Sequence, residues 1–526
     1  MISEAKLLVS AEVSRALDSE AQTEWGFNVF SLIEAAGRAC ARVLVNVLPD
    51  YFSGQPRITV VAGTGNNGAD AMVMLRSWII SGLIESSSST LLLKRFPKDG
   101  EAAPWVDLFR SLEKMKVPVV TWPDETSDEI LENILAKSGI VLDGIAGTGL
   151  EGPLSEAAAE MVKAVNSCSH ERSLVVSVDL PSGNFEKWEP GMPIITADYT
   201  LAIEPQKYCI YTPGARPHAG TILSVGGIFP QELISSHEWA ELLDWDSVKG
   251  RLPKISKDAY KTKRGTVEIR AGSTGTTGAA LVASRGAQAA GAGLIHLVAD
   301  DEIYQILASQ VGGIMVSPAS LETSVFEGRF RPDALLLGSG WGKTLDRTQV
   351  LNKALTLEKQ GIPLILDADV ISLVRYTVFN GNAILTPHPG EFNKISGIEK
   401  KESMKNPAPI LLEFARKRNA VILFKGHVIT IAAPDGRLGV VDGMSPGLAA
   451  GGSGDLLAGF CAAIAARMIQ DSNFDAYTCA AAAATLLIAS GRSDVLKSRF
   501  TDPLEVADEA ADLAGIAWLR GDGFHG

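Results

Sequence analysis

The run Gly451-Gly452-Ser453-Gly454-Asp455 leads directly into the apolar segment 456–463, which the sequence predicts to be a buried helix. Small residues let backbone amides face a ligand, and the unpaired amides and positive end of the following helix favour a phosphate or a developing oxyanion. The sequence therefore predicts an anion site. Asp455 is either the N-cap of this helix or a general base beside the phosphate, and the motif alone leaves both interpretations open.

Short apolar runs alternate with helical segments along most of the chain, a pattern typical of parallel βαβ units. In the first half we expect strands at 58–62, 91–93, 117–121, 140–142, 174–178 and 199–203. In the second half we expect them at 266–271, 294–298, 334–337, 363–366, 383–385, 421–424 and 428–431. The composition, 46% hydrophobic with many Gly and few aromatic residues, is that of an α/β enzyme.

A chain of 526 residues is too long for one hydrophobic core. The strand pattern breaks around 228–263, where prolines, paired serines and a lysine-rich segment occur. We predict a first domain at 1–227, a linker at 228–250 and a second domain at 251–526. The basic cluster Lys254–Arg264 is either a solvated linker or a source of contacts to phosphates in the second site.

The formal net charge of −13 argues against a nucleic-acid partner, because no basic block balances it. Five cysteines without CxxC spacing favour buried thiols in a reducing compartment over a zinc site or a disulfide framework: Cys40, Cys168, Cys209, Cys461 and Cys479. No secretory signal or membrane-spanning stretch is evident. We expect a cytoplasmic homo-oligomer with small-molecule substrates.

Three strand ends in the first half carry polar residues. The segment Gly63–Asp70 follows a predicted strand and precedes a helix, as in a diphosphate cradle of the Rossmann type or in a plain βα turn. Its adjacent asparagines could bind a cation or a polar ligand. Asp143 and Asp179 each end a strand, and each alone could be a loop cap. Because the carboxyl ends of parallel strands meet at one edge, we expect these groups to form a site.

Taken together, the motifs GTGNNGAD, DGIAGTGL and SVDLPSG resemble the N-terminal domain of bifunctional NAD(P)H-hydrate repair enzymes over residues 5–225. The resemblance implies a Rossmann-like three-layer αβα domain, an isomerase that epimerises hydrated NADH and NADPH, and Asp179 as acid/base. It implies a potassium ion held by Asn67, Asp143 and Ser182. It also implies substrate contacts from Asn66, Asn67, Gly68, Ala69, Asp70, Gly147, Thr148, Gly149, Leu150, Glu151, Gly152, Pro153 and Asp179. Ala69 stands where the family usually has a second glycine.

The chemistry of this step agrees with the residues. Epimerising a carbinolamine carbon requires the hydroxyl to leave and return, or the ring to open and close. Either route needs a group that passes protons near neutral pH. Asp179 is the candidate in this half of the chain.

Glycine loops and strand-end acids recur in the second half. A strand, a glycine turn and a helix follow one another in segment 268–280. The loop Gly338–Gly342 follows another strand, and Asp367 and Asp369 end a third. Prolines on both sides of His388 fix where its imidazole points, which favours binding over a purely structural role.

Lys425 ends a strand before a glycine, which suits either a nucleotide phosphate or simple solvation. With it, the motifs AGSTGTTGAA, GSGWG, LDAD, TPHPGE, FKGH and GGSGDLLAG resemble the C-terminal domain of the same repair enzymes over residues 251–519. That domain is a ribokinase-like αβα fold with ADP- or ATP-dependent NAD(P)H-hydrate dehydratase (lyase) activity. Ser453 stands where the family usually has a threonine, and residues 370–372 differ from the residues that are commonest in the family.

The resemblance implies that Asp455 is the base for the substrate hydroxyl, which attacks the terminal phosphoryl group. It implies nucleotide contacts from Lys425, Gly426, His427, Val428, Ile429, 445–449, Gly452, Ser453 and Gly454, and substrate contacts from Gly340, His388 and Asp455. Magnesium is expected with the nucleotide. Fusion of both domains in one chain resembles the bacterial arrangement, and because bacterial-type members use ADP, the resemblance favours ADP over ATP.

Two alternatives stay open at this point. The second domain could be a ribokinase-like small-molecule kinase, which shares the anion site and the catalytic aspartate but leaves a stable phosphoester. The first domain could be a non-catalytic nucleotide sensor or a protein-binding module.

Overall fold

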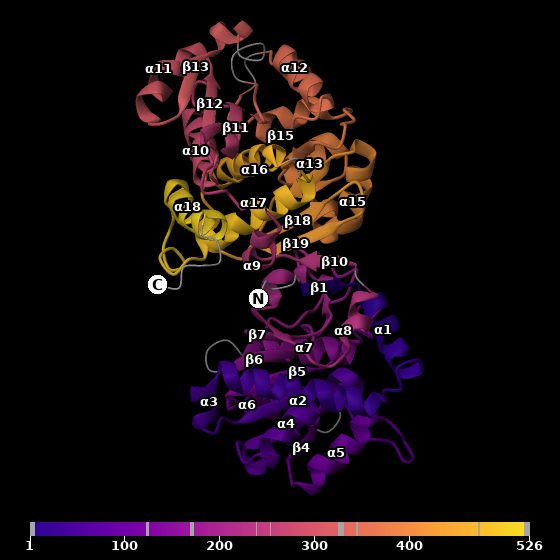
Figure 1. The fold of residues 1–526 in the computed structure, drawn as a ribbon. Helices are drawn as coiled ribbons and strands as arrows, with labels where there is room; N and C mark the ends of the chain where they lie inside the picture. Colours follow the sequence, from indigo (N-terminus) through magenta and orange to yellow (C-terminus); the bar gives the residue numbers. More distant parts are fainter. Residues whose placement is uncertain are drawn as a thin grey trace. The chain divides into compact units, whose positions relative to one another are not determined.

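The computed structural model describes residues 6–122, 126–168, 173–237, 239–252, 254–324, 331–342, 346–471 and 474–519 (Figure 1). The chain forms two compact units that divide between Ala240 and Glu241. This point lies inside segment 228–250, for which the sequence predicts a linker. The segment contains α8 (Gln231–Ser235), β10 (Ala240–Leu242) and α9 (Trp245–Val248).

The N-terminal unit is built on a parallel sheet with the strand order β4-β3-β2-β5-β6-β7-β9. Its strands are β2 (Ile58–Ala62), β3 (Ser89–Leu93), β4 (Val119–Thr121), β5 (Ile140–Gly144), β6 (Leu174–Val178), β7 (Tyr199–Ile203) and β9 (Thr221–Val225). A short parallel pairing joins β1 (Lys6–Val9) to β8 (Gln206–Lys207). Most strand residues are buried, as expected for a parallel sheet that is covered on both faces.

Helices cover both faces of this sheet. They are α1 (Ala11–Thr23), α2 (Val29–Val47), α3 (Pro49–Ser53), α4 (Asn66–Ile80), α5 (Pro104–Lys114), α6 (Asp128–Ala136) and α7 (Glu156–Cys168). Along β2, Val60 packs with α2, α4 and α5, whereas Val61 packs with α6 and α7 on the other face. Successive side chains of a strand point to opposite faces, so one strand contributes to both cores. The predicted three-layer αβα fold is confirmed.

The C-terminal unit has strands in the order β13-β12-β11-β14-β15-β16-β17-β18-β19-β10 (Figure 1). They are β11 (Thr266–Arg270), β12 (Leu294–Ala299), β13 (Met315–Pro318), β14 (Ala334–Leu337), β15 (Leu364–Leu366), β16 (Ala383–Leu385), β17 (Val421–Phe424), β18 (Val428–Ala432) and β19 (Leu438–Asp442). The pairs are parallel except β17 with β18 and β18 with β19.

Two groups of helices pack on this second sheet. They are α10 (Thr277–Ala289), α11 (Asp301–Gln310), α12 (Thr348–Lys359), α13 (Pro389–Ser396), α14 (Lys400–Lys405), α15 (Pro407–Arg418), α16 (Ser453–Gln470), α17 (Ala476–Gly491) and α18 (Pro503–Leu519). Helix α16 is buried along most of its length and packs closely on α10. A Cβ at Gly459 would lie 2.2 Å from the Ala283 carbonyl oxygen, so small residues are required at this crossing. The unit has the predicted αβα arrangement.

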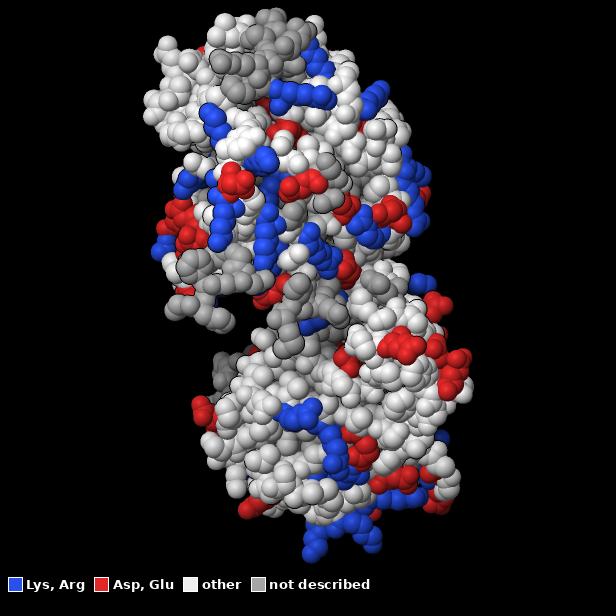
Figure 2. Space-filling model, in the orientation of Figure 1, with Lys and Arg blue, Asp and Glu red and all other residues white. Residues whose placement is uncertain are grey.

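Charged side chains of both signs are distributed over each unit on the face drawn in Figure 2. Within the described ranges, no helix is both long enough and apolar enough to cross a membrane.

Candidate active sites

A cavity of 480 Å³ opens at the carboxyl ends of β2, β5 and β6 in the N-terminal unit. Its walls come from α1, α2, the first turn of α4, the loop 145–150 and the end of β8. Of the substrate contacts expected from the sequence, the cavity is lined by Asn66, Asn67, Asp70, Gly147, Thr148, Gly149, Leu150 and Asp179. Gly68, Ala69, Glu151, Gly152 and Pro153 are not among its lining residues.

The glycine-rich segment differs locally from the expected open turn. Helix α4 begins at Asn66, so both asparagines belong to its first turn. Ala69 is fully buried in the core between α4 and the sheet, so its methyl group replaces the family's glycine away from the cavity. Gly68 is required for packing, because a Cβ there would lie 2.3 Å from the Gly63 carbonyl oxygen.

Asn67, Asp143 and Ser182 come together around the backbone of Ala146. The Asn67 Nδ2 group donates to the Ala146 carbonyl oxygen at 3.0 Å. The Ser182 hydroxyl donates to the same oxygen at 3.0 Å and accepts from the Ala146 amide at 2.9 Å. The Ser182 amide donates to Asp143 Oδ2 at 2.9 Å. The three residues that the resemblance assigns to a potassium ion therefore form one connected group of oxygen donors.

Asp143 is fully buried and carries a carboxylate at the centre of this group. Its Oδ2 atom also accepts from the Ser177 hydroxyl at 2.7 Å, and its Oδ1 atom accepts from the Ile145 amide at 3.2 Å. Burial raises the pKa of Asp143, and these hydrogen bonds lower it in part. A monovalent cation beside the carboxylate would offset this burial, and oxygen ligands are what such a cation requires.

Asp179 makes a buried ion pair that sequence reasoning missed. The Lys207 Nζ atom lies 2.7 Å from Asp179 Oδ1 and also donates to the Ile203 carbonyl oxygen at 3.1 Å. Asp179 has a φ of +63°, a left-handed conformation that is uncommon for a residue other than glycine. A lone lysine inside the apolar segment 199–211 was the available signal, because a buried lysine requires a partner.

In the C-terminal unit, α16 begins at Ser453 and its N-cap is Gly452, which has a φ of +99°. Asp455 is the third residue of the helix, so the interpretation of Asp455 as the N-cap is wrong. Gly452 in a left-handed conformation starts the helix three residues earlier than a capping Asp455 would. Burial, followed by the nearby Asp367, raises the pKa of Asp455 to about 6. This value suits a group that accepts a proton near neutral pH.

Asp367 and Lys425 form a second buried ion pair beside Asp455. The Lys425 Nζ atom lies 2.7 Å from Asp367 Oδ1, which also accepts from the Thr386 hydroxyl at 2.6 Å. The Ser339 hydroxyl donates to Asp367 Oδ2 at 2.8 Å. Burial acts to lower the pKa of Lys425, but Asp367, Glu391 and Asp455 raise it above its usual value.

The segment 425–429 is divided between a loop and a strand. Val428 and Ile429 belong to β18 and are 1% and 3% exposed, so these two residues are buried in the strand. Gly454 lies beside the lysine, because a Cβ there would lie 3.3 Å from Lys425 Nζ. The ammonium group of Lys425 thus lies at the start of α16.

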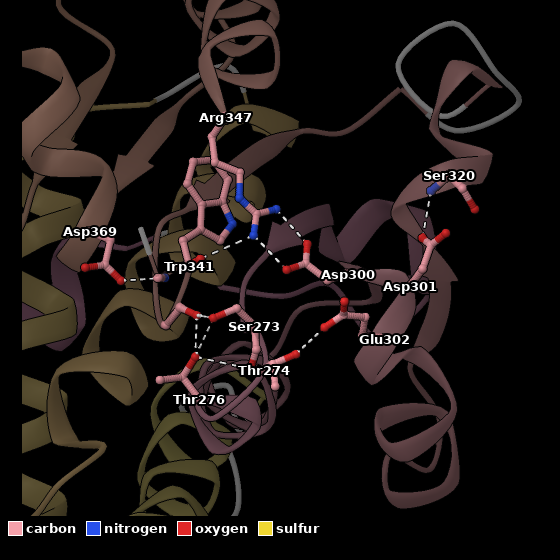
Figure 3. A network of polar contacts seen from close by, with 12 residues as sticks. Ser273, Thr274, Thr276, Asp300, Asp301, Glu302, Ser320, Trp341, Arg347 and Asp369 are labelled. Atoms are coloured by element: carbon pink, nitrogen blue, oxygen red, sulfur yellow. Dashed lines mark hydrogen bonds and ion pairs between the residues drawn. The ribbon is translucent and has the colours of Figure 1, made fainter. Parts of the chain in front are cut away.

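The loop Gly338–Gly342 is held by polar contacts from several elements (Figure 3). The hydroxyls of Ser273 and Thr276 both donate to the Gly340 carbonyl oxygen, at 3.0 and 2.6 Å. The Gly342 amide donates to Asp369 Oδ2 at 2.8 Å. Gly340 itself has a φ of +64°. The loop therefore has a defined conformation in which the Gly340 backbone is fixed at the carboxyl end of β14.

Arg347 supports the same loop from its far side (Figure 3). Its two terminal nitrogens donate to the two carboxylate oxygens of Asp300 at 2.7 and 2.8 Å, and one of them donates to the Trp341 carbonyl oxygen at 3.3 Å. The guanidinium also lies 5.1 Å from the centre of the Trp341 ring. These contacts connect the loop to the end of β12.

His388 has a local structural role that the sequence did not reveal. It is the N-cap of α13, and its Nδ1 atom accepts from the Gly390 amide at 2.9 Å. The Glu391 carboxylate accepts from the His388 amide at 2.9 Å, which completes a capping box. Just over half of the His388 side chain remains exposed, so the same ring can still contact a ligand.

Two α/β units, each with its reactive side chains at the carboxyl edge of a parallel sheet, define a two-domain enzyme of the nucleotide-binding α/β class. Comparison with family models gives two matches. Residues 29–209 match the YjeF-related protein N-terminus, and residues 267–509 match the NAD(P)H-hydrate dehydratase model.

Relatives match over both units. The bifunctional NAD(P)H-hydrate repair enzyme Nnr of Thermofilum pendens is 30% identical over 471 residues, which cover 86% of each chain. The enzyme of the same name from Moorella thermoacetica is 29% identical over 88% of each chain. A Bacillus subtilis ADP/ATP-dependent NAD(P)H-hydrate dehydratase structure is 26% identical, covers 52% of this chain and 97% of its own, and has a TM-score of 0.46. The chain belongs to the family of bifunctional NAD(P)H-hydrate repair enzymes.

Proposed function

We propose that this chain repairs hydrated NADH and NADPH with two active sites. The N-terminal unit interconverts the R and S hydrates, and the C-terminal unit dehydrates the S hydrate while consuming ADP, with AMP and phosphate as products. The observation that carries the proposal is that this member of the family has both features: a cavity lined by Asp179, and Asp455 at the start of α16.

In the N-terminal unit, Asp179 is the acid/base, and Lys207 orients it through an ion pair at 2.7 Å. The cavity of 480 Å³ is large enough for a nicotinamide and part of its nucleotide. Asn66 and the loop 147–150 bind the nucleotide. Asn67, Asp143 and Ser182 hold the potassium ion, which contributes a positive charge next to the buried Asp143 carboxylate.

In the C-terminal unit, Asp455 accepts the proton of the substrate hydroxyl as that hydroxyl attacks the terminal phosphoryl group. The amides of 452–454 and the Lys425 ammonium stabilise the negative charge of the transferred group. The phosphorylated hydroxyl then leaves as phosphate. The Gly340 loop and His388 position the nicotinamide, and the segments 425–429 and 445–449 line the nucleotide.

Magnesium is held mainly by the nucleotide phosphates with one or two protein carboxylates. The described residues contain no group of three or more His, Cys, Asp or Glu side chains placed to form a metal cage. Asp369, partly exposed at the end of β15 with one oxygen fixed by the Gly342 amide, fits the role of such a single carboxylate.

The experiment that tests the proposal uses the full chain and a mixture of hydrate epimers with ADP or ATP. Full recovery of reduced-nicotinamide absorbance with one nucleotide supports both activities. Recovery of only the S fraction contradicts the epimerase assignment. A stable phosphoester without recovery of absorbance would instead identify a small-molecule kinase, and no nucleotide-dependent change would contradict the dehydratase assignment.

We also propose a cytoplasmic location and a homo-oligomeric state. Cys40, Cys209, Cys461 and Cys479 are buried free thiols, which agrees with a reducing compartment. The side chain of Cys168 lies outside the described residues. Size-exclusion chromatography with light scattering would test the oligomeric state directly.

A further inference from the structure

A second carboxyl group, that of Asp70, lines the same cavity as Asp179. Asp70 lies on α4, one turn after the asparagines, and is 8% exposed. Its Oδ1 atom is buried and makes no hydrogen bond with any described residue. No described lysine or arginine forms an ion pair with it, whereas Asp179 has Lys207 at 2.7 Å.

The two carboxyl groups therefore have opposite environments. A buried carboxylate without a partner is strongly disfavoured relative to its neutral form. Burial, and then the negative charge of Asp179, raise the pKa of Asp70 well above its usual value, and Lys207 offsets this only in part. Asp179, by contrast, has the Lys207 ammonium 2.7 Å from its Oδ1 atom. Carboxyl groups with opposed environments in one site are typical of an acid and base pair.

Other titratable groups face Asp70 from the elements around it. Asp18 on α1 is a third carboxyl group in the cavity, and Cys40 on α2 is a fully buried thiol. Burial raises the pKa of the Cys40 thiol well above its usual value, so this thiol is neutral and transfers no proton at neutral pH. Asp18 is only half-buried. Burial therefore favours the neutral form of the Asp18 carboxyl group less than it favours the neutral form of Asp70.

We propose that the unpartnered, buried Asp70 is the proton donor of the epimerase cavity and that the Lys207-paired Asp179 is its proton acceptor. This inference rests on the epimerase function proposed above and names a second catalytic residue for it. It assigns to Asp70 a chemical role distinct from a contact with the nucleotide.

The neutral Asp70 carboxyl gives its proton to the substrate hydroxyl, and the carbon–oxygen bond breaks with both electrons leaving on oxygen, as water. The lone pair of the ring nitrogen forms a carbon–nitrogen double bond and leaves a cationic ring. Water adds to the opposite face, the double-bond electrons return to nitrogen, and the Asp179 carboxylate accepts the released proton. A proton then returns from Asp179 to Asp70 through water. Alternatively, the reverse epimerisation follows, with the protonated Asp179 as donor and the ionised Asp70 as acceptor.

The test compares Asp70→Asn with the wild-type full chain, without nucleotide, so that the dehydratase is inactive. The purified S hydrate of NADH is the substrate, and the R hydrate is followed by chromatography. We expect kcat to fall by about 10²- to 10⁴-fold with KM within about threefold. The wild-type kcat should decrease at alkaline pH as Asp70 ionises, and this alkaline limb should be absent from the variant. The Asp70→Glu variant should restore part of kcat and the limb.

Three outcomes would overturn the assignment. The first is that kcat of Asp70→Asn lies within about fivefold of the wild-type value. The second is that Asp70→Asn retains the alkaline limb of the pH profile. Loss of the limb in Asp18→Asn, but not in Asp70→Asn, would transfer the role to Asp18. If the wild type itself produces no R hydrate, the epimerase function is contradicted, and this result is distinct from a failure of the Asp70 assignment.

A measurement on the wild type keeps the proposal testable if Asp70→Asn does not fold. Infrared spectroscopy should show a neutral carboxyl band that disappears on alkaline titration in parallel with the loss of kcat. Absence of a carboxyl band that titrates with kcat would overturn the proposal. Dehydratase activity of the same preparation shows whether the C-terminal unit of each variant is intact.

Discussion

The Nζ atom of Lys207 lies 2.7 Å from Oδ1 of Asp179, and the two side chains are 4% and 11% exposed. Both charges are therefore largely removed from water. Removing one partner of such a pair leaves the other as an uncompensated buried charge. Lys207 lines the cavity, so it supports both the fold of the N-terminal unit and the position of its acid/base.

The Lys207→Met variant should lower the free energy of unfolding of the N-terminal unit by about 3–5 kcal/mol. Epimerase kcat should fall with it, because the Asp179 carboxyl group loses the ion pair that fixes its position. Urea unfolding and the epimerase assay measure the two effects. The matched control is Arg38→Met, which removes the exposed pair with Glu34 and should cost less than about 1 kcal/mol. Equal effects of both variants would contradict a special role for the buried pair.

The pH dependence of the dehydratase should follow Asp455. Its pKa of about 6 means that the carboxylate is mostly protonated below pH 5 and mostly ionised above pH 7. Because a general base acts in its ionised form, kcat/KM should rise with pH through about 6 and then level off. Asp455→Asn should lose most of the dehydratase rate. A pH profile that is flat between 5 and 8 would contradict the role of Asp455 as base.

The same raised pKa predicts the sign of a stability effect. The folded chain binds a proton at Asp455 more tightly than the unfolded chain, so stability from this group decreases as pH rises between about 4 and 6. At neutral pH the buried carboxylate is therefore unfavourable. Asp455→Asn should raise the stability of the C-terminal unit at pH 7, on the order of 1–2 kcal/mol, and should not do so at pH 4. Thermal unfolding at the two pH values measures the difference.

The Gly340→Ala variant should impair the dehydratase more than it impairs folding. Gly340 has a φ of +64°, and a Cβ there would lie 2.6 Å from the Ala279 Cβ and 3.0 Å from the Thr276 carbonyl oxygen. The loop must then shift away from Ser273 and Thr276. Gly361→Ala is the matched control, because Gly361 also has a positive φ but nothing lies within 4 Å of its Cβ. We expect KM for the hydrate to rise at least severalfold in Gly340→Ala only, with epimerase activity unchanged in both variants.

The sequence could predict the strands because buried parallel strands are nearly continuous apolar runs, and β2, β6, β7, β14, β16 and β17 have the expected bounds. It missed β9 and β13, in which only one of nine residues is buried, and β19, which pairs antiparallel with β18. It also missed the partners of reactive groups. Lys207 meets Asp179, and Lys425 meets Asp367, only through tertiary packing, which strand-end motifs do not encode. The helix start at Ser453 depended on the left-handed Gly452, which has no sequence signature among adjacent glycines.

His388 combines a cap and a predicted substrate contact, and the two roles can be separated. Its Nδ1 atom accepts from the Gly390 amide at 2.9 Å, which leaves Nε2 as the protonated nitrogen of the neutral ring, 3.3 Å from the Glu391 carboxylate. Asparagine is a good N-cap, so His388→Asn should change stability by only a few tenths of a kcal/mol, whereas His388→Ala should cost about 1 kcal/mol. If the ring also contacts the hydrate, KM should rise about 3- to 10-fold in both variants. A KM of His388→Asn equal to the wild-type value would show that His388 is only a cap, because this variant keeps the cap and removes the imidazole.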